Sequence, residues 1–196
     1  MLAKMTIFAK NMDTGNIEKE FRRIEALFQV RAFARQDGAL LGLIWVISFA
    51  ALIFMPQSML NSLLMMATPF IVGWRLIKFR NYALGGSISF KRALVYCLYS
   101  FFYASLILAV SQMLYFSYLD NGRFADMLNS TISQALPVYK AYGVNTRQLT
   151  DAVATITSLS ALEIAFMFML QNLCIGFFLS MPIALIGKKR NKNEKQ

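Results

Sequence analysis

The chain has 196 residues, of which 57% are apolar and only 15% are charged, whereas soluble domains carry about 25% charged residues. Together with a mean hydropathy of +0.49, this composition excludes an ordinary soluble globular protein. The net charge is +10 and histidine is absent, which excludes His-ligated metal sites and Ser-His catalytic triads.

Residues 1–37 are predicted to form a cytoplasmic segment that contains a basic amphipathic helix. Ile17, Phe21, Ile24 and Phe28 recur at helical spacing, with charged residues between them. Such a helix can lie on lipid headgroups, with its basic residues against anionic lipid. A solvated helix, or one that packs on another subunit, is the alternative. The residues proposed for headgroup contact here are Arg22, Arg23 and Arg31.

Long stretches without charge predict an all-α fold, a bundle of four membrane-spanning helices within residues 38–187. Residues 38–74 carry no charge, which is about twice the length that one span needs, and Pro56 divides them. The predicted spans are about 38–55, 59–77, 93–119 and 159–187. As an alternative, residues 38–77 could form a re-entrant hairpin, since each leg has only about 17 residues, or roughly 26 Å.

The distribution of basic residues predicts the orientation of these spans. Seventeen Lys and Arg residues lie before the first span, around the 75–92 loop and in the tail at 188–196, whereas only three lie in the 120–158 loop. By the positive-inside rule both termini are cytoplasmic, in a bacterial inner membrane. The first apolar stretch follows a long charged segment without a cleavage site, so we expect it to be retained. Further candidates for headgroup contact are Arg75, Lys78, Lys188, Lys189 and Arg190.

The 120–158 loop is predicted to be an extracytoplasmic helical hairpin. Asp120, Asn121 and Gly122 form a turn signal at its start, and the first arm is expected to end before Pro137. Asn145 or Thr146 can cap a second arm. No helix breaker follows, so this arm is expected to form one rod with the last span.

Polar and small residues inside the spans are candidates for helix packing. Small residues four apart allow helix backbones to approach closely, and side-chain amides in lipid normally hydrogen-bond to a neighbouring helix. Helix packing is therefore favoured over a substrate site for these residues. They are Gly38, Gly42, Gln112, Gln171, Asn172, Gly176 and Ser180.

Glu163, at the outer boundary of the last span, is interpreted as the only acidic residue near a span. A carboxylate at headgroup level can reach water, so an interfacial role is favoured over one in ion coupling. The sequence shows no phosphate-binding loop, paired-carboxylate motif or metal-ligand spacing. No catalytic, cofactor-binding or metal-ligating residue is therefore predicted.

Three segments carry a family resemblance: the end of the second span at Arg75 to Arg80, the run Gly86–Ala93, and the run Tyr115–Asp120. Over about residues 35–187 the chain resembles a domain-of-unknown-function family of four-span inner-membrane proteins from Gram-negative bacteria. The resemblance implies four spans with a helical external loop between the third and the fourth. It supplies no catalytic residues, and the first 34 residues lie outside it.

These observations favour a non-enzymatic accessory or assembly module that acts through helix packing and its external loop. The expected partners are anionic lipids on the cytoplasmic side and either a second copy or another membrane protein, and not nucleic acid. A small oligomeric transporter or channel is the alternative, supported by Pro69, Pro182 and the amides within the spans. A lipid-modifying enzyme, using the external acids Asp120, Asp126 and Asp151 or the basic loops, has the least support.

Overall fold

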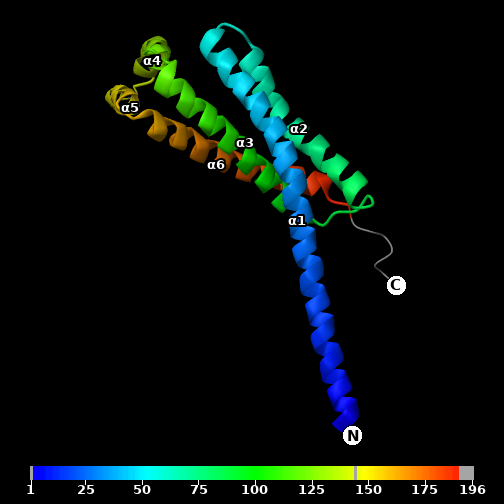
Figure 1. The fold of residues 1–196 in the computed structure, drawn as a ribbon. Helices are drawn as coiled ribbons and strands as arrows, with labels where there is room; N and C mark the ends of the chain where they lie inside the picture. Colours follow the sequence, from blue (N-terminus) through cyan, green and yellow to red (C-terminus); the bar gives the residue numbers. More distant parts are fainter. Residues whose placement is uncertain (1, 144, 190–196) are drawn as a thin grey trace.

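The computed structural model describes residues 2–143 and 145–189, with side chains from residue 16 onward except those of residues 22 and 23. Its six helices are shown in Figure 1. They are α1 (Leu2–Phe54), α2 (Leu60–Ala83), α3 (Phe90–Tyr118), α4 (Arg123–Ala141), α5 (Arg147–Thr157) and α6 (Ala161–Gly187). The described residues hold no β-strand beyond one isolated bridge between Ile88 and Lys189. The predicted all-α fold is confirmed.

Four of these helices are long and apolar enough to cross a membrane: α1 from Asn16 onward, α2, α3 and α6. The protein is therefore a multi-pass membrane protein, as predicted. The first two helices turn at Pro56, where α1 ends at Phe54 and α2 begins at Leu60. Because α2 has 24 residues, it is about 36 Å long, which favours full crossing over a re-entrant hairpin.

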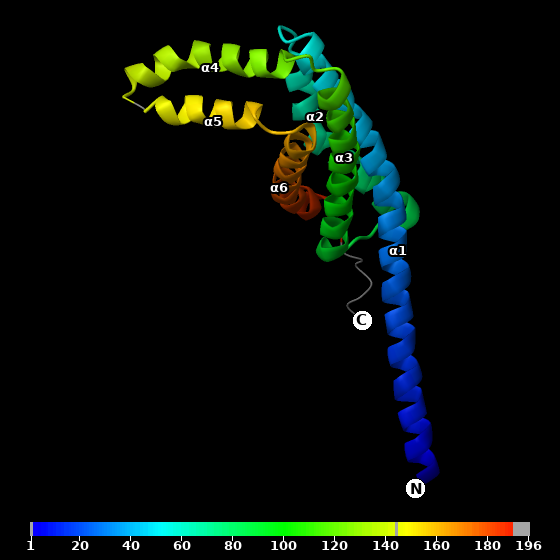
Figure 2. The ribbon, with the colours of Figure 1, turned by 60° about the vertical axis from the view of Figure 1, so that its left-hand side comes forward.

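The N-terminal segment continues α1 without interruption, which differs from the separate surface helix that the sequence predicts. Residues 17–32 and the first span belong to one helix of 53 residues, because no proline occurs before Pro56. Figures 1 and 2 show this helix extending well beyond the bundle. A helix lying flat on the headgroups would need a bend near residue 35, and α1 has none. Arg22 and Arg23 have side chains outside the described set.

The bundle is packed most closely near residues 84–89, which we call the loop end, and opens toward the Pro56 turn, which we call the hairpin end. Helix α3 lies between α1 and α6, and α2 packs mainly on α1. Tyr96, Phe101 and Leu76 are buried in this core. Toward the hairpin end α2 diverges from α6 in Figure 1, whereas α1 and α3 stay in contact, with the rings of Phe49 and Tyr115 5.4 Å apart.

Helices α4 and α5 form the predicted helical hairpin, but two of its details differ from the prediction. Helix α4 continues through Pro137 to Ala141, and the chain turns only at Gly143, where φ is +71°. The expected single rod is also wrong, because α5 ends at Thr157 and a new helix begins after Ser160. Figure 2 shows α4 and α5 side by side, projecting away from the four spans.

Candidate functional site

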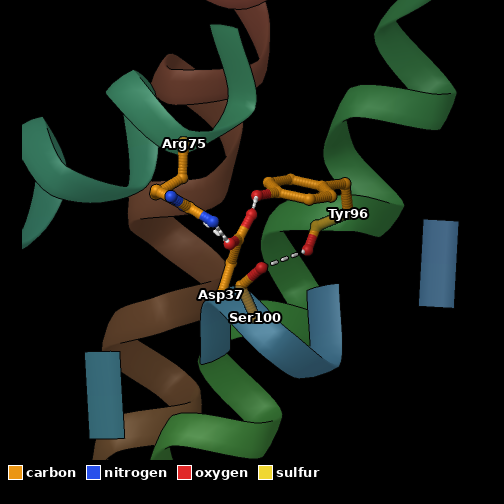
Figure 3. Close-up of polar contacts among 4 residues, drawn as sticks. All are labelled: Asp37, Arg75, Tyr96 and Ser100. Carbon is orange, nitrogen blue, oxygen red and sulfur yellow. Dashed lines mark hydrogen bonds and ion pairs between the residues drawn. The ribbon is translucent and has the colours of Figure 1, made fainter. Parts of the chain in front are cut away.

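A buried ion pair joins the first two spans near the loop end. Asp37 of α1 is only 5% exposed, and its Oδ1 accepts hydrogen bonds from Nε of Arg75 at 2.6 Å and from Nη2 of the same guanidinium. The hydroxyl of Tyr96 on α3 donates to the other carboxylate oxygen. Ser100 in turn donates to the carbonyl oxygen of Tyr96 at 2.9 Å, as Figure 3 shows. One carboxylate therefore connects three helices.

The surroundings of this ion pair make it a structural contact. The gap between Asp37, Arg75 and Tyr96 has no room for a water molecule. The ring of Tyr96 stacks on Phe79 with centroids 4.9 Å apart and an interplanar angle of 6°. A charge that leaves water needs a partner, so each of these two charges lowers the free-energy cost of burying the other. The ion pair holds α1 and α2 together and leaves neither charge available for a ligand.

The ion pair also changes the role predicted for Arg75. The sequence places this side chain among the headgroup candidates, whereas it points inward to Asp37. Its neighbour Lys78 lies over the ring of Trp74, with Nζ 4.1 Å from the centroid.

Sequence reasoning missed Asp37 itself. The signal for it is an acid and an arginine bounding the same charge-free stretch, at positions that a two-span hairpin brings to one level.

Glycines bring α3 into close contact with both of its neighbours. A Cβ atom on Gly38 would lie 2.7 Å from the Ser100 carbonyl oxygen, and one on Gly42 would lie 3.0 Å from Cβ of Ile107. On α6, a Cβ on Gly176 would lie 2.7 Å from the Phe101 side chain. Ser180 is buried beside it and donates to the Gly176 carbonyl oxygen at 2.6 Å. The three glycines therefore lie at the contacts of α3 with α1 and α6, and Ser180 is buried one turn further along α6.

A cavity of about 440 Å³ lies between the spans toward the hairpin end. All six helices contribute to its lining, which is largely apolar and includes Trp45, Leu108 and Phe168. Among the described residues, no charged side chain lines it. Its polar side chains are Ser48, Asn61, Gln112, Gln171 and Asn172. Mostly apolar pockets of about 300–1,000 Å³ with a few polar groups are typical of small-molecule sites.

The three amides predicted for helix packing all line this cavity, and none of them makes the expected hydrogen bond to a neighbouring helix within the described part of the chain. Gln112 is 4% exposed, and its Oε1 has no hydrogen-bond partner among the described residues. Asn172 is buried on α6, whereas Gln171 is exposed beside it. Other side chains supply the interhelical bonds: Trp45 Nε1 donates to Thr68 Oγ1 at 3.0 Å, and Ser48 donates to Asn61 Oδ1 at 2.7 Å.

The remaining basic candidates lie toward the loop end and beyond it. Arg31 donates from Nε to the Tyr103 hydroxyl at 3.1 Å. Lys188 and Lys189 are exposed, and the backbone of Lys189 exchanges two hydrogen bonds with Ile88, at 2.9 and 3.1 Å. Arg190 lies outside the described residues. The structure thus places the described headgroup candidates toward one end of the bundle, whereas Arg123, Lys140 and Arg147 belong to α4 and α5 at the other end.

Glu163 has a local structural role at the start of α6. Its Oε2 accepts hydrogen bonds from the Ser160 backbone N–H at 2.8 Å and from the Ser160 hydroxyl at 2.6 Å. The Ser160 side chain in turn accepts from the Glu163 backbone N–H, which completes a capping box. The exposed Glu163 carboxylate is therefore part of the cap that starts α6. This Ser160–Glu163 capping box explains why α5 and α6 are separate helices.

A model of a protein family described as "Protein of unknown function (DUF4199)" matches residues 36–189. The matched region contains the Asp37–Arg75 ion pair, the cavity and the hairpin. No curated protein matches the chain, and no solved structure matches it.

Proposed function

The chain belongs to the DUF4199 family of proteins of unknown function, and from this premise we propose that it is a non-enzymatic accessory or assembly module of the bacterial inner membrane. It acts through helix packing and through the α4–α5 hairpin. Both termini lie in the cytoplasm, and the hairpin lies on the opposite side. The single observation that carries the proposal is the hairpin, which projects away from the four spans.

The hairpin presents apolar and aromatic surface at the end of α4. Val138, Tyr139 and Tyr142 are 56%, 42% and 82% exposed. Aromatic residues of this kind are enriched where proteins contact each other, because they contribute large rigid contact area. Within the bundle, the charges of Asp37 and Arg75 neutralise each other and Glu163 caps a helix. This arrangement supports a role in binding a partner more than a role in chemistry.

The partners that we propose are lipids and membrane proteins, and not nucleic acid. Lys188 and Lys189 are exposed at the loop end, where they can contact anionic headgroups. The hairpin surface fits a second copy of the chain or another membrane protein. A small oligomeric transporter or channel is the second candidate, because the cavity of about 440 Å³ contains polar side chains within the membrane region.

The proposed orientation predicts where reporters fused to the chain are active. A reporter that works only in the cytoplasm is expected to be active at residue 196 and inactive at about residue 140, because 17 basic residues lie on one side and three on the other. The Gln57→Cys variant is expected to react with an impermeant thiol reagent added from outside. The reverse reporter pattern contradicts the orientation, and a Gln57→Cys variant that does not react favours a re-entrant hairpin.

The assembly role is tested by a photoreactive amino acid placed at Tyr142, with Tyr82 as the matched control. The two side chains are 82% and 84% exposed, but Tyr82 lies at the end of α2, near the loop end. We expect a discrete crosslinked product from position 142 only, and we expect Val138→Ser to reduce it. A product of twice the chain mass identifies a second copy as the partner. A smear at both positions, or no product, contradicts the assembly role.

Glu163→Gln separates the two candidate functions. We expect this substitution to leave folding and the crosslink at position 142 nearly unchanged, because Gln can also complete a capping box. Thermal unfolding in detergent measures the stability of the fold, and gel mobility measures the amount of crosslinked product. A loss of activity in a folded Glu163→Gln protein, with the crosslink retained, would instead indicate ion coupling and favour the transporter.

A further inference from the structure

We propose that the cavity between the spans binds a neutral long-chain lipid whose hydroxyl group hydrogen-bonds to Gln112. This inference does not depend on the proposed assembly role, since it concerns a different part of the molecule. It rests on the unsatisfied amide of Gln112, the lining of the cavity, its volume and its opening.

The strongest observation is that Gln112 lacks a partner among the described residues, as does the Tyr115 hydroxyl one helical turn along α3, whereas two other polar side chains of the lining are bonded across helices. Trp45 and Ser48, which line the same cavity, donate to Thr68 and Asn61 across helices. Gln112 is 4% exposed and its Oε1 accepts no hydrogen bond from any described residue. Leaving such an atom unsatisfied costs about 1–3 kcal/mol. A bound hydrogen-bond donor would remove this cost.

The chemistry of the lining defines the polar group of the ligand. None of the charged side chains that the structure describes lines the cavity, so a charged headgroup would have no counter-ion among them. Asn172 of α6 also lines the cavity, is buried, and has no hydrogen bond within the described part of the chain. An amide both donates and accepts. A hydroxyl group does the same, so it can donate to the Oε1 atom of Gln112 and accept from another amide of the lining.

The size and opening of the cavity define the rest of the ligand. A volume of about 440 Å³ lies within the range of small-molecule sites and accommodates one alkyl chain with one hydroxyl group. Met65 of α2 and Ile175 of α6 line the cavity and are 42% and 45% exposed. The opening thus lies between two spans, on the side that faces lipid. Met65, Met127 and Met167 give the lining flexible, adaptable side chains.

The test uses the full chain in lipid nanodiscs and a photoreactive probe, tetradecanol with a diazirine in its chain. Labelled residues are located by mass spectrometry. Three competitors are compared: tetradecanol, its methyl ether, which cannot donate a hydrogen bond, and the trimethylammonium compound of equal chain length. We expect saturable labelling of cavity residues, with tetradecanol competing about tenfold better than the ether, equivalent to about 1.4 kcal/mol. The cationic compound should compete least.

Variants test the role of the amide. Gln112→Leu is expected to reduce labelling of the cavity about tenfold, whereas Val110→Leu, at an exposed position on the same helix, should leave it unchanged. The unliganded Gln112→Leu protein should be at least as stable as wild type, because the substitution removes an unsatisfied polar group. If Gln112→Leu does not fold, the competition between tetradecanol and its methyl ether on the wild-type protein still tests whether the ligand donates a hydrogen bond. Equal competition by alcohol and ether, equal labelling of Gln112→Leu, or labelling spread over the lipid-facing surface would overturn the proposal.

Discussion

Replacing Arg75 by Leu is expected to destabilise the folded protein by about 5 kcal/mol, because the buried Asp37 carboxylate would lose its counter-charge. Replacing Asp37 by Leu is expected to cost less, about 3 kcal/mol, since the remaining Arg75 side chain is 24% exposed and can still reach a polar environment. The order of the two values follows from the difference in burial between the two partners. Thermal or denaturant unfolding of the purified protein in detergent measures both.

The double variant Asp37→Leu with Arg75→Leu completes the cycle. We expect it to be more stable than either single variant, because two apolar side chains in place of a buried ion pair leave no uncompensated charge. Tyr96→Phe is the matched control, since it removes one hydrogen bond to the carboxylate and keeps both charges. Additive losses in the double variant would show that the two charges do not stabilise each other.

Gly38→Ala is expected to destabilise the protein by about 1–3 kcal/mol through overpacking. The new Cβ would lie 2.7 Å from the Ser100 carbonyl oxygen and 2.8 Å from Cβ of Tyr103, and the first of these is a backbone atom that a side-chain rotation cannot move. Helices α1 and α3 would have to separate next to Asp37. The unfolding temperature in detergent is the measurement.

Gly73→Ala is the matched control for this substitution. Gly73 also lies inside a spanning helix, but the nearest atom to its added Cβ is 3.9 Å away. Alanine there relieves the conformational entropy cost of glycine, so we expect a gain of about 0.5–1 kcal/mol. Equal effects at the two positions would mean that glycine's backbone freedom, and not the close approach of α1 to α3, determines the stability.

The sequence predicts the spans well because the relevant signal is local. A charge-free run and its bounding charges specify where a helix can lie in lipid, and Pro56 and the Asp120–Gly122 turn separate helices where the sequence predicts a break. The close approach of helices at Gly38 and Gly176 also follows from residue size.

The remaining features depend on contacts between distant segments. Asp37 and Arg75 are 38 residues apart, and only the packing of α1 against α2 shows that the charges meet. The sequence singles out Gln112, Gln171 and Asn172, but the cavity that they share depends on how far α2 and α6 diverge. The break between α5 and α6 required recognition of a Ser160–Glu163 capping box inside a continuous amphipathic pattern.

The ion pair between Asp37 and Arg75 has a consequence for biogenesis. Both residues belong to α1 and α2, which are synthesised before α3. A lone aspartate or arginine is costly to insert even toward the end of a span, because its charge must leave water. Because the two charges can pair as soon as α2 is complete, the first two spans can enter the bilayer together as a hairpin without net charge at this level. When α3 is inserted, the Tyr96 hydroxyl can donate a hydrogen bond to the Asp37 carboxylate, which connects the third span to the first two.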